Sequence, residues 1–152
     1  MNLYELSEIA DKRFSHGEDI PQNIIEGVRQ IVSIGGYIGM AQINPIAGNI
    51  EYNAKKIAKY IKYSCKIGLD MVVFPELALM GYPIEDTIDR HPIIVEENIK
   101  WLKGLAKITV GTTALVGFVE PRKQDAEGKK YFNSVAILKD GKIAGIVRKS
   151  LL

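Results

Sequence analysis

Short apolar runs alternate with segments of helical periodicity from Tyr37 onward, and this alternation constrains the fold more than any other feature. The order along the chain is strand, helix, strand, helix, strand, strand, strand. Strands separated by helices are typical of an α/β fold, because a parallel connection needs a crossover of about a dozen residues or more. The last two strands are close enough to form a hairpin, so the sheet is predicted to be mixed.

The helices are bounded by residues with clear conformational preferences. The first is predicted to follow Asn49, whose side chain can cap backbone N–H groups, and to end at Gly68, which tolerates the left-handed conformation. Its predicted apolar face consists of Ile50, Ala54, Ile57, Ile61 and Cys65. The second helix is predicted to open at Pro92 and to run to about Ile108.

Five apolar runs predict the strands. They are "YIGMAQI" (37–43), "DMVVFP" (70–75), "ALVGFVE" (114–120), "YFNSVAILK" (131–139) and "KIAGIVRK" (142–149). The unbroken apolar character of the second run predicts burial on both of its faces. Asp140-Gly141 favours a hairpin turn between the last two. Residues 1–36 follow a different pattern and are predicted to be a helical N-terminal extension, whose role the sequence does not indicate.

The amino-acid composition limits which binding partners and which cellular location are expected. The chain has 152 residues, 47% of them hydrophobic and 25% charged, which is ordinary for one globular domain or a large piece of one. Lys and Arg number 20 and Asp and Glu 18, so charge gives no basis for a nucleic-acid or membrane partner. The chain has one cysteine and two histidines, which are not spaced as zinc ligands, so no metal site is expected. A single cysteine is also typical of a reducing compartment, so a cytoplasmic location is expected.

Glu76 is a candidate for acid–base chemistry. It follows "VVFP" at the carboxyl end of a predicted strand, the edge where the sites of open α/β sheets gather. Partial shielding there can raise the pKa of a carboxyl group, which then acts as a general base or acid near neutral pH. The same position also suits a loop cap or a surface ion pair.

Lys149 ends the last predicted strand beside Arg148. Because side chains alternate along a strand, one cation is expected to point outward into solvent and the other toward the layer that Glu76 leaves. A lysine near an acid can stabilise a developing oxyanion. Position alone favours the plainer alternative, two solvated cations at a strand end.

The other candidate features give weaker support for a catalytic or nucleotide-binding role. Cys65 lies on an apolar helix face with no neighbouring histidine and no helix N-terminus to lower its pKa, so it is predicted to be a core residue and not a nucleophile. No glycine-rich phosphate motif follows a strand, so no nucleotide site is expected in this chain.

The segments "IGMAQINPIAGNIEYNAKKI", "GLDMVVFPELALMGYPIEDTI", "ALVGFVEP" and "YFNSVAILKDGKIAGIVRKSLL" together resemble the nitrilase (carbon–nitrogen hydrolase) superfamily. More narrowly, the proline and acidic pair after Gly81-Tyr82 resemble the amino-terminal glutaminase domain of glutamine-dependent NAD synthetases. The resemblance covers residues 37–152. It implies that this segment is the N-terminal half of an α-β-β-α sandwich with a mixed sheet.

That family uses a Glu–Lys–Cys triad. The resemblance implies that Glu76 is the general base and acid, that Lys149 stabilises the oxyanion, and that Tyr82 lies in a loop near the substrate. In this chemistry a thiolate attacks the side-chain amide of glutamine, ammonia departs, and water releases glutamate. The family's cysteine matches no position of this chain, and Cys65 does not correspond to it. The chain is therefore expected to be a truncated domain that is inactive alone.

Three functions remain open. The first is glutamine hydrolysis that supplies ammonia for NAD synthesis, with ATP and deamido-NAD bound by a synthetase domain outside this chain and no cofactor within it. The second is a fragment of a stand-alone amidase or nitrilase. The third is a non-catalytic binding or assembly module, because half a sandwich exposes a sheet face. A homo-oligomer, or pairing with the missing half of the domain, is expected to cover that face.

Overall fold

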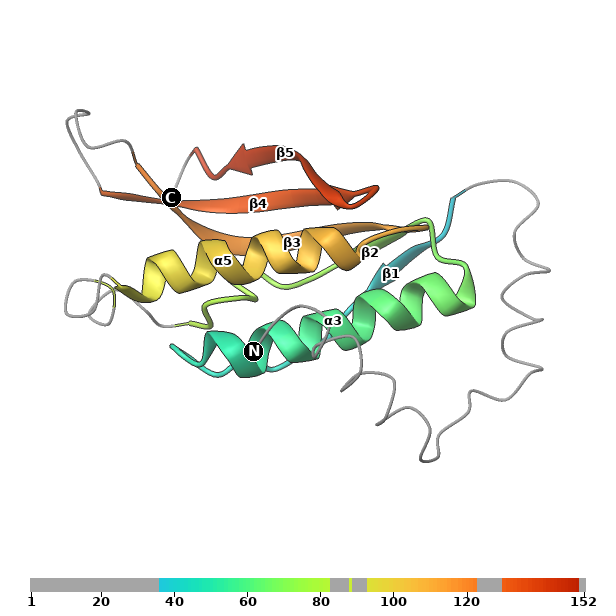
Figure 1. The fold of residues 1–152 in the computed structure, drawn as a ribbon, viewed down its shortest axis with the longest axis horizontal. Coiled ribbons are helices and arrows are strands. Elements are labelled where there is room, and N and C mark those ends of the chain that lie inside the picture. Colours follow the sequence, from blue (N-terminus) through green and yellow to red (C-terminus); the bar gives the residue numbers. More distant parts are fainter. Residues whose placement is uncertain (1–35, 83–87, 89–92, 123–129, 151–152) are drawn as a thin grey trace.

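The structure, a computed structural model, describes residues 36–82, 88, 93–122 and 130–150. The described elements follow the predicted order, and the α/β class with a mixed sheet is confirmed (Figure 1). They are β1 (Ile38–Met40), α3 (Ile50–Ile67), β2 (Met71–Val73), α5 (Ile93–Ile108), β3 (Thr113–Pro121), β4 (Tyr131–Lys139) and β5 (Lys142–Arg148). The predicted helices of residues 1–35 and the predicted helix start at Pro92 lie outside the described residues.

The five strands form one sheet in the order β1-β2-β3-β4-β5. β1, β2 and β3 pair in parallel, whereas β4 is antiparallel to both of its neighbours. The carboxyl ends of β1, β2, β3 and β5 therefore lie at the same edge of the sheet. We call this the carboxyl edge. The β4–β5 turn is the predicted one, since Asp140 and Gly141 both have positive φ angles, of 50° and 77°.

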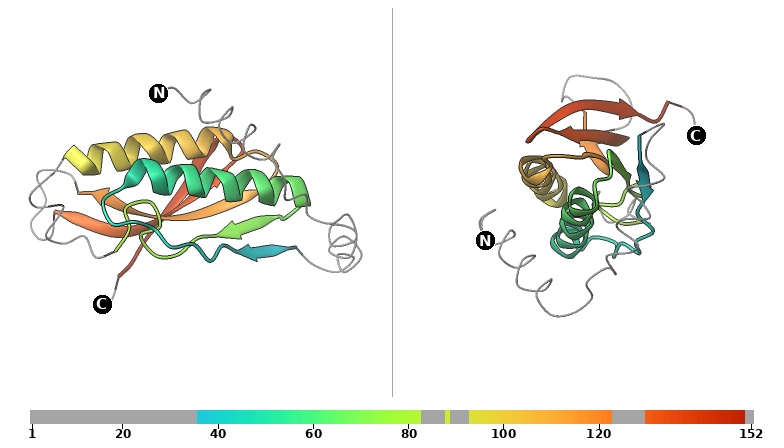
Figure 2. Two further views of the ribbon diagram at one scale, coloured as in Figure 1. Left: turned by 90° about the horizontal axis from the view of Figure 1, so that it is seen from below. Right: turned by 90° about the vertical axis from the view of Figure 1, so that its right-hand side faces the viewer.

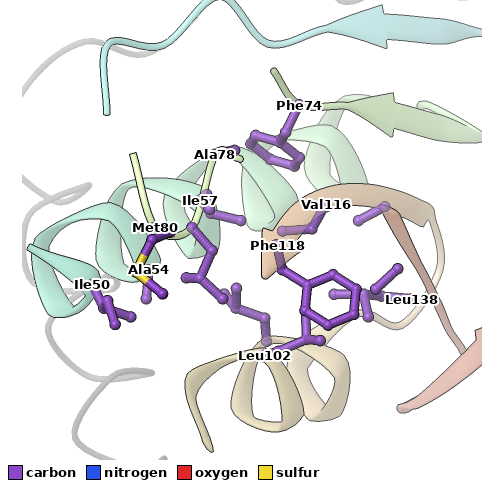
Figure 3. Close-up of a cluster of buried hydrophobic side chains, with 14 of the residues drawn as sticks. Ile50, Ala54, Ile57, Phe74, Ala78, Met80, Leu102, Val116, Phe118 and Leu138 are labelled. Atoms are coloured by element: carbon purple, nitrogen blue, oxygen red, sulfur yellow. The ribbon is translucent and has the colours of Figure 1, made fainter. Parts of the chain in front are cut away.

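Both described helices lie against one face of the sheet (Figure 2). Apolar side chains fill the space between the two layers, where Ile57 and Leu102 from the helices meet Val116, Phe118 and Leu138 from the strands (Figure 3). Each of these five side chains is at most 1% exposed. Full burial of a side chain of this size contributes about 1.5–3 kcal/mol. This layer packs the sheet against the helices and fixes where its carboxyl edge lies.

Helix α3 has the predicted ends, and four of the five residues of its predicted apolar face, Ile50, Ala54, Ile57 and Ile61, are buried. The side chain of Asn49 accepts a hydrogen bond from the backbone of Tyr52, and Gly68 adopts a φ of 79°. The prediction that Cys65 is a core residue is wrong, because it is exposed and its thiol donates to the carbonyl of Val110 at 3.2 Å. The buried stripe of α3 ends instead at Ser64, three residues after the last buried isoleucine.

The opposite face of the sheet carries apolar side chains that the described residues leave uncovered. Ile38, Met40 and Val147 are 64%, 81% and 60% exposed. In β2, one buried side chain is flanked by the half-buried Met71 and Val73, which share the uncovered face with β1. The prediction that this strand is buried on both faces is therefore wrong within the described residues, because both described helices pack on the same side. Among the described helices, none is long and apolar enough to cross a membrane.

Candidate active site at the carboxyl edge

Glu76 lies in a tight turn that follows β2. The Ala78 N–H donates to the carbonyl of Pro75 at 3.2 Å, and the Gly81 N–H donates to the carbonyl of Leu77 at 2.7 Å. Leu77 takes a φ of 51°, unusual for a residue with a branched side chain, and is only 5% exposed. Its apolar side chain anchors the turn inward, while the side chain of Glu76 remains 58% exposed.

Strand β3 sets the depth at which this turn sits. A Cβ atom at Gly117 would lie 2.5 Å from the backbone nitrogen of Leu77 and 2.7 Å from the carbonyl oxygen of Pro75. The Leu79 N–H also donates to the carbonyl of Gly117 at 3.1 Å. Only glycine permits such a close approach of two backbones. The position of Glu76 therefore depends on a residue without a side chain.

Helix α3 braces the same turn through Asn53. Its side-chain amide donates to the carbonyl of Leu79 at 3.1 Å and to that of Ile46 at 2.8 Å, and its oxygen accepts from the Ile46 N–H at 2.8 Å. The residue is fully buried, so these bonds satisfy it away from water. Sequence reasoning missed Asn53, although an asparagine on an otherwise apolar helix face was the available signal.

Lys149 reaches Glu76 from the end of β5. Its Nζ lies 3.0 Å from Oε1 of Glu76, across 73 residues of sequence. The backbone N–H of Lys149 donates to the carbonyl of Asn133 at 2.9 Å. This hydrogen bond extends the β4–β5 pairing one residue beyond Arg148. The prediction that Arg148 and Lys149 point to opposite faces is confirmed, and the plainer alternative of two solvated cations is wrong, because each pairs with a glutamate. The catalytic role of either residue stays a prediction.

Arg148 points elsewhere and is not simply solvated, as the sequence suggested for the outward cation. Its guanidinium donates to both carboxylate oxygens of Glu120, at 2.8 and 2.6 Å, and lies 4.4 Å from the ring centre of Phe132. The Ser134 hydroxyl donates to the same carboxylate at 2.8 Å. A two-point arginine–carboxylate pair is geometrically specific. It ties β5 to β3 and β4 immediately before Lys149.

Asn133 completes the surroundings of Glu76. Its side-chain amide donates to Oε1 of Glu76 at 2.5 Å, so this oxygen receives both Asn133 and Lys149. Within the described part of the chain, Oε2 of Glu76 has no hydrogen-bond partner. Sequence reasoning missed Asn133 and Glu120, because contacts between side chains of different strands depend on a pairing register that no local pattern reveals.

The pKa of Glu76 is lowered, and the sequence expectation of a raised pKa is wrong for this structure. The main cause is the hydrogen bond from Lys149, followed by that from Asn133, and slight burial opposes them. Because Glu76 is more than half exposed, desolvation is too weak to dominate. Glu76 is therefore ionised at neutral pH, the form that can accept a proton, and the lowered pKa makes it a weaker base than an ordinary glutamate.

The remaining predicted residues lie apart from this pair. Tyr82 is 72% exposed and, among the described residues, makes no hydrogen bond or ion pair with Glu76 or Lys149. Cys65 lies near the end of α3, just before β2 begins, whereas Glu76 follows the other end of β2. The chain's single cysteine is thus at the opposite edge of the sheet. In the described ranges, no three His, Cys, Asp or Glu side chains are grouped to hold a metal ion.

Residues 37–152 match the carbon-nitrogen hydrolase family, and the chain belongs to this family. It is similar to the glutamine-dependent NAD(+) synthetase of Thermotoga maritima, with 40% identity over 114 residues that cover 74% of this chain and 19% of that protein. The corresponding enzyme of Acinetobacter baylyi is 34% identical over 114 residues, which are 74% of this chain and 20% of that protein. The chain therefore spans about a fifth of the length of these relatives.

Solved structures agree with this assignment. The glutamine-dependent NAD+ synthetase of Acinetobacter baumannii superposes with a TM-score of 0.67 and 30% identity, covering 76% of this chain and 21% of that one. An amidase from Nesterenkonia sp. superposes with a TM-score of 0.62 and 18% identity, and the match covers 80% of this chain and 46% of the amidase chain. The amidase likeness concerns the fold alone. The predicted nitrilase-type fold is confirmed.

Proposed function

We propose that this chain supplies the general base and the oxyanion-stabilising lysine of a glutaminase site, which releases ammonia from glutamine for NAD synthesis. The observation that carries the proposal is the contact of 3.0 Å between Glu76 and Lys149 at the carboxyl edge. This pair occurs in a chain that is 40% identical to a glutamine-dependent NAD(+) synthetase over the matched segment.

The two residues divide the chemistry between them. The ionised Glu76 accepts the proton of a cysteine thiol, and the thiolate attacks the carbonyl carbon of the glutamine side chain. Lys149 stabilises the negative charge on the resulting oxyanion. When the C–N bond breaks, Glu76 gives its proton to the leaving nitrogen and ammonia departs. Water, activated by the same carboxylate, then hydrolyses the thioester to glutamate and restores the thiol.

The nucleophile in this scheme is a cysteine outside this chain. Cys65 lies at the opposite edge of the sheet, donates to the Val110 carbonyl, and faces neither Glu76 nor Lys149. We therefore propose that the 152-residue chain is inactive alone. ATP and deamido-NAD belong to a synthetase domain elsewhere in the protein. We propose a cytoplasmic location, because a free thiol persists most readily in a reducing compartment.

The uncovered sheet face supports the proposed pairing with a second layer. Ile38 and Met40 on β1 and Val147 on β5 expose apolar side chains at the two sides of this face, and exposed apolar surface is typical of interfaces. The other half of the domain or a second copy of this chain is the proposed occupant. Tyr82, exposed at the end of the turn that carries Glu76, is proposed to border the glutamine pocket that this layer closes.

A chimera tests the proposal. This chain would replace its matching segment in the Thermotoga maritima synthetase, and NAD formation would be measured with glutamine and, separately, with ammonium. Glu76→Gln is expected to abolish synthesis from glutamine and to leave synthesis from ammonium intact. Glu51→Gln is the matched control, because Glu51 also pairs with a lysine, Lys55, at 2.7 Å but on the exposed face of α3.

The outcomes separate the alternatives. Glutamine-dependent synthesis that survives Glu76→Gln contradicts the proposal. Ammonia release from the isolated chain, abolished by Glu76→Gln, contradicts the proposed inactivity. Hydrolysis of other amides by the chimera without transfer of ammonia to NAD synthesis would favour the stand-alone amidase function. A folded chimera with no dependence on Glu76 or Lys149 would favour the non-catalytic module.

A further inference from the structure

We propose that Asn133 is a positioning residue that aligns Glu76 and Lys149 with each other, an inference that rests on the proposed glutaminase function. Asn133 holds one partner through its backbone and the other through its side chain. Its carbonyl accepts from the Lys149 N–H at 2.9 Å, and its amide donates to Oε1 of Glu76 at 2.5 Å. Among the described residues, Asn133 is the one that hydrogen-bonds to both Glu76 and Lys149.

The register of the sheet explains why a single residue does both. Asn133 pairs with Val119 of β3 on one side, and Lys149 continues the β5 register on the other. Directly opposed residues of neighbouring strands send their side chains to the same face, so Asn133 and Lys149 stand next to each other there. The turn after β2 then brings Glu76 against both, because Gly117 admits it close to β3.

The two donors differ in a way that suits the reaction. Both donate to Oε1, so that Oε2, which has no hydrogen-bond partner among the described residues, is the oxygen toward which a thiol proton can move. Lys149 carries a charge and must also bond the developing oxyanion. The side-chain amide of Asn133 is neutral and need not bond the oxyanion, so it keeps the carboxylate plane oriented while the lysine is shared. A displacement of a reacting group by about 1 Å can cost on the order of a hundredfold in rate.

The residues next to Asn133 and Lys149 along their strands form a separate hydrogen-bonded group on the other face of the sheet. Ser134, the next residue along β4, donates to Glu120, which also binds Arg148, the residue before Lys149. Adjacent positions of β4 and β5 are thus tied together on the helix-covered face, while Asn133 and Lys149 meet on the opposite face. This arrangement offers a matched control, because Ser134→Ala alters the same strand without removing the donor to Glu76.

The first test is titration of the Glu76 carboxyl group by carbon-detected NMR in the 152-residue chain, with Glu76→Gln to assign the resonance. Asn133→Ala and the similarly sized Asn133→Leu are expected to raise the pKa of Glu76, since each removes a hydrogen bond to the ionised form. Ser134→Ala is expected to leave it unchanged, and Asn133→Gln, which restores an amide donor, to return it toward the wild-type value. An unchanged pKa in both Asn133→Ala and Asn133→Leu would overturn the inference. This readout needs no activity, so it stands even if the proposed function fails.

The second test uses the chimera. Asn133→Ala is expected to lower kcat for glutamine-dependent synthesis by about tenfold to a hundredfold, with a smaller effect on KM and none on ammonium-dependent synthesis. Partial recovery of kcat in Asn133→Gln is the expected signature of a positioning amide. Equal losses with glutamine and ammonium would show a purely structural effect and would contradict the assignment.

Discussion

The backbone of Gly117 lies directly against the backbone of Leu77, so the strand in the middle of the sheet supports the turn that presents Glu76. Any Cβ at position 117 would lie 2.5 Å from the Leu77 nitrogen, a separation that Cβ atoms essentially never show. The neighbouring atoms are backbone, which cannot turn aside as a flexible side chain can. The site is thus built into the sheet and is not carried on an independent loop.

Gly117→Ala is therefore expected to displace the turn. We expect a loss of about 1–3 kcal/mol in the free energy of unfolding, as for other overpacked sites, measured by urea denaturation. We also expect the Glu76–Lys149 contact to weaken, seen as a rise in the pKa of Glu76. Gly145→Ala is the control, because a Cβ there meets only the tip of Ile137 at 3.4 Å. Equal stability of the two variants would contradict the packing argument.

Asn53→Leu tests the brace from α3. The substitution keeps the approximate size of the fully buried side chain but leaves the Leu79 carbonyl and the Ile46 N–H without this partner, while the Ile46 carbonyl keeps the Asn49 N–H. We expect the free energy of unfolding to fall by roughly 2–4 kcal/mol, measured from urea midpoints. Asn49→Ser, which retains a capping side chain, is expected to change it by only about 0.5 kcal/mol. A stable Asn53→Leu variant would show that water replaces these bonds.

Glu120 is expected to make stability depend on pH. Its pKa is lowered chiefly by the hydrogen bond from Arg148, with a further contribution from Ser134, and its side chain is only 13% exposed. Because the folded-state pKa lies below the unfolded one, this stabilisation is present above the ordinary pKa of glutamate, about 4.3, and is lost as pH falls through the folded-state value.

Glu120→Gln should therefore lower the free energy of unfolding by about 1–3 kcal/mol at neutral pH. The difference from the wild type should shrink on acidification below about pH 4. Urea denaturation at a series of pH values measures both curves. A difference that stays constant across the series would mean that the carboxylate charge contributes nothing and that shape alone matters.

Val147→Lys tests the uncovered face of the sheet. Val147 is 60% exposed on the side that the described helices do not cover. If this face binds a second layer, the charge is expected to reduce association of the chain with itself or with the rest of its domain, measured by light scattering after size-exclusion chromatography. Lys142→Glu changes the charge of β5 at its other end and serves as control. A wild-type chain that is monomeric at every concentration would argue against self-association.

Sequence reasoning succeeded where the cause is local. Asn49 and Gly68 cap α3 through contacts within a few residues, and Asp140-Gly141 requires only its own backbone conformation. Side-chain alternation separated Arg148 from Lys149, but the placing of Glu76 and Lys149 in one site came from the family resemblance, since position alone favoured two solvated cations. The successful predictions follow from the chain's nearest neighbours and from the period of a strand.

The failures concern contacts that depend on the assembled sheet. Asn133 and Glu120 acquire their partners from the register of three strands, which hydrophobic patterns do not determine to a single residue. The pKa of Glu76 was expected to rise because burial was assumed, whereas the face it occupies is open. Cys65 was placed in the core because a stripe of period 3.6 fits it nearly as well as it fits Ser64.

The long separation between Glu76 and Lys149 also orders the events of folding. Their contact closes a loop of 73 residues, and we expect it to form after the β4–β5 hairpin has paired with β3, because that pairing places Lys149 beside the turn after β2. Closure over such a distance is entropically unfavourable, so helices and local turns are expected to precede it. The ion pair is then a reporter of the last step of assembly. A chain whose hairpin has detached would retain its helical signal while the Glu76 carboxyl group titrates as an ordinary glutamate.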